Sequence, residues 1–116
     1  MGGKAADSVS PASVTFRGAQ GLSLVADEWN RDIPNASVHP SVLMLHGGGQ
    51  TRHSWKDTGQ RLGRQGVHVI AIDTRGHGDS AWSPHGLYAV DELCRDTVAV
   101  IEQINRPVVL IGASIG

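Results

Sequence analysis

The sequence predicts an α/β fold in which a short antiparallel hairpin precedes a parallel sheet with crossover helices. Apolar runs typical of strands buried on both faces occur at residues 42–45 and 108–111, and a third, interrupted only by His68, occurs at residues 67–72. Segments with helical periodicity separate these runs, and such alternation implies right-handed connections between parallel strands. The length of 116 residues, 40% of them hydrophobic, is enough for one domain at most.

The amino-terminal segments predict a leader followed by the hairpin. Residues 1–12 are rich in Ala, Ser and Gly, so we expect a flexible leader, and we expect the partial α/β domain to span residues 13–116. Partial alternation at 13–17 and 22–29, on either side of Gly18 and Gly21, predicts two strands joined by a turn. Residues 30–40 contain two prolines and predict a loop.

Two helices are expected between the apolar runs. Ser54 is placed to cap a helix that runs to Arg64, with Asp57 approximating a capping box and Gly66 ending it. The second helix spans residues 91–105 and ends before Pro107. Its periodicity places the following residues on one apolar face: Leu93, Cys94, Thr97, Val98, Ile101 and Ile104. We therefore expect Cys94 to pack as a small hydrophobic side chain.

Composition excludes several classes of partner. The chain has 10 basic and 11 acidic side chains without a basic cluster, so we expect no binding to nucleic acid or to anionic membranes. No apolar stretch is long enough for a membrane span, and residues 1–10 lack the apolar core of a secretory signal. Cys94 is the single cysteine and cannot form an internal disulfide, which fits a cytoplasmic location.

A Gly-x-Ser-x-Gly motif, formed by Gly112, Ser114 and Gly116, follows the apolar run at 108–111. The motif is typical of a nucleophile elbow, a sharp turn between a strand and a helix in which the flanking glycines allow close backbone approach. Ser114 would then project from the carboxyl end of a central strand, where ligands bind in open α/β sheets. The alternative is a glycine-rich turn in which Ser114 only caps a following helix.

A second glycine-rich segment, His46-Gly47-Gly48-Gly49-Gln50, follows the run at 42–45. Successive glycines leave backbone N–H groups unshielded, which suits stabilisation of an oxyanion. A phosphate-binding loop is the competing interpretation, but neither a Walker ending nor a Gly-x-Gly-x-x-Gly spacing is present.

The third motif is a polar loop, Asp73-Thr74-Arg75-Gly76-His77-Gly78-Asp79-Ser80, which follows the run at 67–72. Taken alone, it predicts a tight turn held by Asp73, Arg75 and Asp79. The spacing of the histidines does not match helix-borne metal ligands, so no metal site is expected.

The order of these motifs resembles the amino-terminal half of an α/β-hydrolase, over about residues 13–116. The resemblance implies that Ser114 is the nucleophile and that the N–H groups of Gly48 and Ile115 form the oxyanion hole. It implies that the remaining motif residues are architectural: His46, Gly47, Gly49, Asp73, Arg75, Gly76, His77, Gly78, Gly112 and Gly116. The family order of nucleophile, acid and histidine makes His77 a turn residue and places the general base after Ser114.

The resemblance further implies a cofactor-free serine hydrolase that acts on a small or medium carbonyl substrate such as an ester. A serine in place of an aspartate at position 114 argues against the dehalogenase and epoxide hydrolase branches, which use a carboxylate. Because any Asp or His of this chain precedes Ser114, we expect a truncated, inactive chain whose last strand forms an apolar edge prone to aggregation. The alternative is a non-catalytic remnant or binding module of the same fold. The sequence does not set the oligomeric state.

Overall fold

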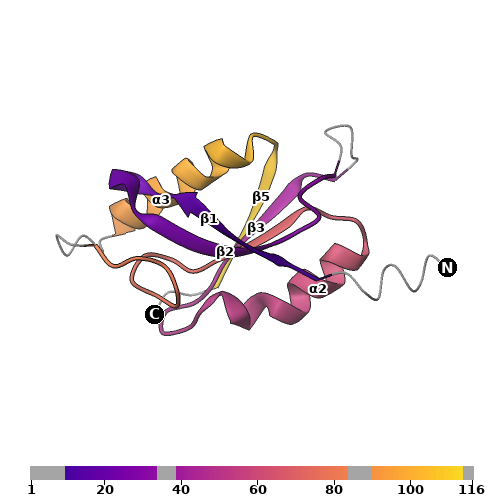
Figure 1. Cartoon of the computed structure of the whole chain (residues 1–116), viewed down its shortest axis with the longest axis horizontal. Coiled ribbons are helices and arrows are strands. Elements are labelled where there is room, and N and C mark those ends of the chain that lie inside the picture. The colour runs from indigo at the N-terminus through magenta and orange to yellow at the C-terminus, as the bar shows by residue number, and fades with distance from the viewer. Residues whose placement is uncertain (1–9, 34–38, 84–89, 114–116) are drawn as a thin grey trace.

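The computed structural model describes residues 10–33, 39–83 and 90–113, which form a five-stranded sheet in the order β1-β2-β4-β3-β5 (Figure 1). The strands are β1 (Ala12–Arg17), β2 (Ser23–Trp29), β3 (Ser41–Leu45), β4 (Val69–Ile72) and β5 (Val108–Gly112). The expected architecture is confirmed: β1, β2 and β4 pair antiparallel, and β4, β3 and β5 pair parallel. Neither of the longer described helices, α2 and α3, has the length and apolar character to cross a bilayer.

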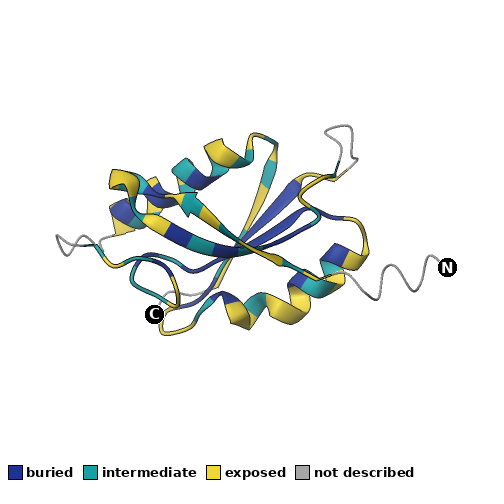
Figure 2. Cartoon of the chain, viewed as in Figure 1, coloured by how far each residue is buried: buried dark blue, intermediate teal, exposed yellow. Residues whose placement is uncertain are grey.

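The two longer helices cover opposite faces of the sheet (Figure 1). The helices are η1 (Ala19–Gly21), η2 (Arg52–Trp55), α2 (Lys56–Arg64) and α3 (Val90–Ile104). Alternate residues of the central strands belong to two cores, so that Leu43 packs on the α3 side and Met44 on the α2 side. Because β3 and β4 are covered on both faces, they are almost entirely buried (Figure 2), which explains their continuous apolar sequence.

The helical segment after β3 begins earlier than expected. Thr51, not Ser54, is the N-cap: its Oγ1 accepts the His53 N–H at 3.4 Å and opens the 3₁₀ turn η2. Ser54 lies inside that turn and donates its hydroxyl to the Thr51 carbonyl at 2.9 Å. The expected capping box with Asp57 does not form, because α2 continues directly from η2 and has no side-chain cap. The expected end is confirmed, since Gly66 adopts φ +80° beyond the helix.

Trp29 packs against a glycine groove on α2. The indole is fully buried, and a Cβ built on Gly59 would lie 2.4 Å from its ring, one on Gly63 2.9 Å. The indole N–H donates to Gln60 Oε1 at 3.1 Å. Only glycine at 59 and 63 lets the α2 backbone approach the sheet this closely.

The apolar face of α3 is less buried than its periodicity predicted. The buried positions are Glu92, Asp96 and Val100, whereas Cys94 is exposed and Val98 is 55% exposed. The expectation that Cys94 packs in the core is therefore wrong. The physical reason is Arg75, a buried cation on the facing loop that draws the carboxylates of α3 inward.

Strand β5 forms an edge of the sheet among the described residues. Val109 and Leu110, which point to opposite faces, are 45% and 49% exposed. Beside β5, on the α3 side, lies an apolar hollow of about 390 Å³ whose lining includes Leu43, Leu110 and Val98. An exposed apolar edge offers unpaired backbone groups and apolar surface to another chain, so we expect self-association.

The edge can be tested with Leu110→Lys, which places a charge on β5. We expect the wild-type chain to associate with increasing concentration and the variant to stay monomeric, because an edge lysine opposes strand pairing. Sedimentation velocity measures both. Thr58→Lys, at an exposed position of α2, adds the same charge and should associate like wild type. A monomeric wild-type chain would contradict the prediction.

The glycine groove can be tested with Gly59→Ala in the Leu110→Lys background. At an exposed helical site, replacing glycine by alanine raises the free energy of unfolding by about 1 kcal/mol. Here the added methyl group would overlap the Trp29 ring. We expect net destabilisation by about 1–3 kcal/mol from overpacking, measured by urea unfolding. Thr58→Ala, one residue earlier and exposed, should change stability by less than about 0.5 kcal/mol. An increase in stability for Gly59→Ala would refute the close contact.

Candidate active site

The segments that carry the three sequence motifs begin at the carboxyl ends of the parallel strands β3, β4 and β5. Leu45 of β3 pairs with Ile72 of β4 and with Gly112 of β5, so the segments that follow these strands start side by side. Pairing continues past β5, because the Ala113 N–H donates to the Leu45 carbonyl at 3.1 Å. Residues 114–116, which include Ser114, Ile115 and Gly116, lie outside the described residues. Their roles stay predictions.

The segment after β3 forms a tight turn. The Gln50 N–H donates to the Gly47 carbonyl at 3.1 Å, and the Gln50 side chain accepts the Gly47 N–H at 3.3 Å. Gly49 takes φ +74°, which is the glycine position of a type II turn. Gly48 is exposed, and no acceptor for its N–H occurs among the described residues. A free N–H at this edge is what an oxyanion site requires.

His46 connects this turn to the loop after β4. Its imidazole is 2% exposed, with Nδ1 at 2.8 Å from the Gly47 carbonyl oxygen and Nε2 accepting the Thr74 N–H at 3.1 Å. Thr74 Oγ1 lies between His46 Nε2, at 3.3 Å, and His77 Nδ1, at 3.1 Å. His77 also contacts the Arg75 carbonyl at 3.0 Å. Both histidines therefore hold loop backbone.

Asp73 is fully buried, and its carboxylate accepts three hydrogen bonds. The donors are the Arg52 N–H at 2.6 Å, the Arg52 guanidinium at 2.5 Å and the Asp79 N–H at 2.9 Å. Burial acts to raise the pKa of Asp73, but these hydrogen bonds and the Arg52 charge outweigh it and hold the pKa below its ordinary value. Gly78 is required here, because a Cβ would lie 2.3 Å from the Asp73 carboxylate.

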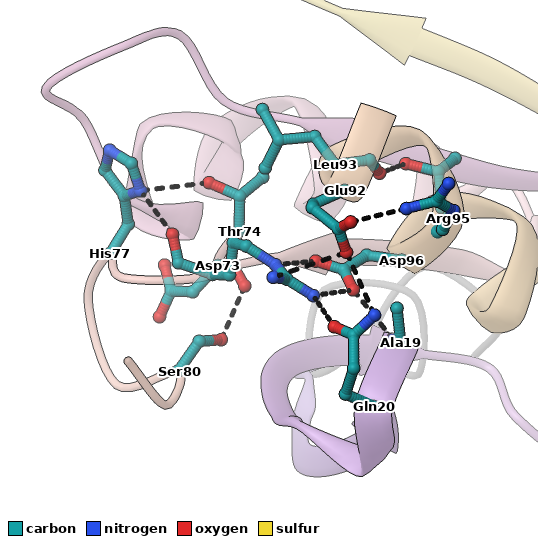
Figure 3. A network of polar contacts seen from close by, with 12 residues as sticks. Ala19, Gln20, Asp73, Thr74, His77, Ser80, Glu92, Leu93, Arg95 and Asp96 are labelled. Atoms are coloured by element: carbon teal, nitrogen blue, oxygen red, sulfur yellow. Dashed lines mark hydrogen bonds and ion pairs between the residues drawn. The ribbon is translucent and has the colours of Figure 1, made fainter. Parts of the chain in front are cut away.

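Arg75 does not hold the loop as the sequence suggested. Its guanidinium makes two hydrogen bonds of 2.7 Å to Asp96 of α3, while Gln20 accepts a third at 3.3 Å. Figure 3 labels both acceptors, Asp96 and Gln20. The role expected of Arg75 belongs to Arg52, which binds Asp73 and also Asp79 at 2.9 Å. Sequence reasoning missed Arg52 because it lies outside the three motifs, in η2, and becomes adjacent to its partners only in the folded chain.

A second polar cluster, also missed, lies at the opposite end of the strands. His68 contacts Ser41 Oγ through Nδ1 and Glu28 through Nε2, each at 2.7 Å. Although these residue types match a hydrolytic triad, Ser41 is only 1% exposed, so the cluster fastens β2 and β3 to the start of β4. Burial acts to raise the pKa of Glu28, but His68 and Arg31 outweigh it and lower that pKa. Within the described ranges, no three His, Cys, Asp or Glu side chains are grouped as metal ligands.

Comparison with known proteins identifies the family. Residues 42–116 match the alpha/beta hydrolase family. An esterase of Mycobacterium tuberculosis is 37% identical over 79 residues, which are 66% of this chain and 25% of the esterase. Two solved structures are similar. An alpha/beta hydrolase from Novosphingobium aromaticivorans has a TM-score of 0.80 and 26% identity, covering 92% of this chain and 36% of that one. The epoxide hydrolase VrEH1 from Vigna radiata has a TM-score of 0.77 and 25% identity, covering 90% and 32%.

The chain therefore belongs to the alpha/beta hydrolase family. Its relatives are hydrolases and include esterases, lipases and epoxide hydrolases. The chain spans about a quarter of the length of the curated esterase and about a third of the solved structures.

Replacement of Asp73 tests the contact that holds the two loops. Asp73→Asn removes one of the carboxylate partners of Arg52, which keeps Asp27 and Asp79. We therefore expect the free energy of unfolding to fall by about 1–3 kcal/mol at pH 7, measured by urea unfolding in the Leu110→Lys background. A carboxylate whose folded pKa is depressed stabilises above its unfolded pKa of about 3.9 and loses that effect as the pH falls. The difference between the two proteins should therefore shrink below about pH 4.

The matched control is Asp57→Asn, which removes the same charge from an exposed position of α2. Because Asp57 lies in the first turn of α2, its replacement should change the free energy of unfolding by no more than about 1 kcal/mol across the same pH range. If Asp73→Asn and its parent showed parallel profiles from pH 7 to pH 3, the ion pair would contribute nothing.

Proposed function

We propose that this member of the alpha/beta hydrolase family carries the nucleophile and oxyanion part of a serine hydrolase site, with Ser114 as the nucleophile. The supporting observation is that the ends of β3 and β5 pair directly, so the segment with the exposed Gly48 and the segment that begins at residue 113 leave the sheet side by side. Nucleophile and oxyanion donor must approach the same carbonyl group, and this arrangement of the two strand ends supports the proposal.

The proposed reaction is acyl transfer through a covalent intermediate. Ser114 Oγ attacks the ester carbonyl carbon, and the N–H groups of Gly48 and Ile115 stabilise the oxyanion that forms. Collapse of this intermediate expels the alkoxide and leaves an acyl group on Ser114, which water then removes. Each step needs a base for the proton of the attacking hydroxyl or water. In the family order the acid and the histidine follow the nucleophile, and only Ile115 and Gly116 do so here. We therefore propose that the 116 residues do not turn over substrate alone.

The proposed substrate is a small or medium carbonyl compound, foremost a carboxylic ester. Support comes from the serine at position 114, because the epoxide hydrolase branch uses a carboxylate as nucleophile, and from the similarity to an esterase. No cofactor enters the proposed chemistry. We also propose a cytoplasmic location, with which the single cysteine is consistent.

Acylation by p-nitrophenyl acetate tests the proposal in the chain as it exists. An oxyanion hole without its base retains a residual acceleration of about 10³–10⁴ over water, so Ser114 should become acetylated slowly, with release of p-nitrophenolate and of the hydroxyl proton to buffer. Because deacylation also lacks its base, the acetyl group should accumulate to one per chain without turnover. Peptide mass spectrometry locates it.

Two serine variants provide the controls. Ser114→Ala should remove the selective acetylation, and Ser41→Ala should not affect it, because Ser41 is buried. Acetylation spread evenly over several serines, or absent from Ser114, would overturn the serine hydrolase proposal and favour a non-catalytic binding module of the same fold.

A further inference from the structure

We propose that His46 is a positioning residue that orients the Gly48 N–H by holding the peptide group between Gly47 and Gly48. The inference rests on the proposed function, in which Gly48 is an oxyanion donor. The inference adds the side chain of His46, its tautomer and the Gly47 carbonyl oxygen through which it acts.

The argument begins with the peptide unit. The Gly47 carbonyl and the Gly48 N–H belong to one planar group, and the described chain has no cis peptide bonds, so the two point in opposite directions. His46 Nδ1 lies 2.8 Å from that carbonyl oxygen, and the Gln50 N–H lies 3.1 Å from it. Fixing the oxygen with these two donors fixes the direction of the Gly48 N–H on the other side of the plane.

The contacts of His46 also assign its tautomer. A carbonyl oxygen only accepts, so Nδ1 must carry a proton to bind Gly47. A backbone N–H only donates, so Nε2 must be unprotonated to bind Thr74 at 3.1 Å. The ring is therefore neutral with its proton on Nδ1, and both nitrogens are engaged. His46 cannot serve as a proton acceptor for Ser114 without releasing Thr74.

Other ionisable side chains lie near His46. The His77 ring lies 5.0 Å away, on the loop after β4, and is a second group that can carry positive charge. From α3, Asp96 and Cys94 line the same hollow as His46, but Asp96 is bound to Arg75. Asp73 is bound to Arg52. Both carboxylates thus already have cationic partners, and neither makes a hydrogen bond to His46 among the described residues.

A pair of substitutions separates the two nitrogens. In His46→Asn the amide nitrogen replaces Nδ1 and can still donate to the Gly47 carbonyl, while the contact with Thr74 is lost. In His46→Gln the longer side chain reaches the place of Nε2 and can accept the Thr74 N–H, while the contact with Gly47 is lost. If His46 served only to join the two loops, the Gln variant would be the better substitute.

We expect the opposite order for acetylation of Ser114 by p-nitrophenyl acetate. His46→Asn should react within about 3-fold of the wild-type rate. His46→Gln should react about 10–100-fold more slowly, because removal of an oxyanion donor lowers the rate by about 10²–10³-fold and a misdirected donor should cost less. Equal rates for wild type and the Gln variant, or an Asn variant as slow as the Gln variant, would overturn the positioning role.

Nuclear magnetic resonance decides the inference without reference to reactivity. The ¹⁵N shifts of the wild-type His46 ring should report a proton on Nδ1, and the Gly48 amide signal should move far in the Gln variant and little in the Asn variant. A proton on Nε2 in the wild type would refute the inference even if neither variant folded. If wild-type Ser114 is not acetylated, the proposed function fails, while the ring tautomer and the Gly48 amide still test whether His46 holds this peptide.

Discussion

The arrangement of the loops at the carboxyl ends of the strands depends on the ion pair between the buried carboxylate of Asp73 and Arg52. Asp73 follows β4 and binds Arg52 of the segment after β3, so one side chain joins the two loops that flank the candidate site. The close approach of Gly78 and the hydrogen bond from Asp79 complete its environment. With this end of the loop fixed, Thr74 lies where His46 can accept its N–H. The direction of the Gly48 N–H therefore depends, through His46 and Thr74, on the buried charge of Asp73.

The sequence was sufficient for the elements that local pattern determines. The strand 42–45 was predictable because burial on both faces requires a continuous apolar run. The same pattern predicted the strand 108–111, although this strand is half exposed in the structure. Gly66 marked a helix end because it needs a positive φ. The N-cap was misplaced because Thr51 and Ser54 have equal capping chemistry and differ only in where the chain leaves the sheet. The buried face of α3 was misjudged because Arg75, 21 residues from Asp96, determines it.

Of the candidate site, the sequence predicted the segments but not their contacts. The glycines after β3 and the loop after β4 were recognised from order and spacing, whereas Arg52 and the Ser41, His68 and Glu28 cluster gave no local signal. Their residues come from separate segments of the chain, and only the folded sheet makes them neighbours. The cluster also shows that residue types alone do not make a hydrolytic site, because access decides whether a serine meets a substrate.

The groove at Gly59 and Gly63 has a consequence for the order of folding. Each interior glycine makes α2 about 1 kcal/mol less favourable than alanine would, and a helix of 9 residues is too short to persist alone in water. Its stability must come from Trp29, a side chain of β2 about 30 residues earlier. We therefore expect α2 to form only as it docks on the sheet against the indole of Trp29.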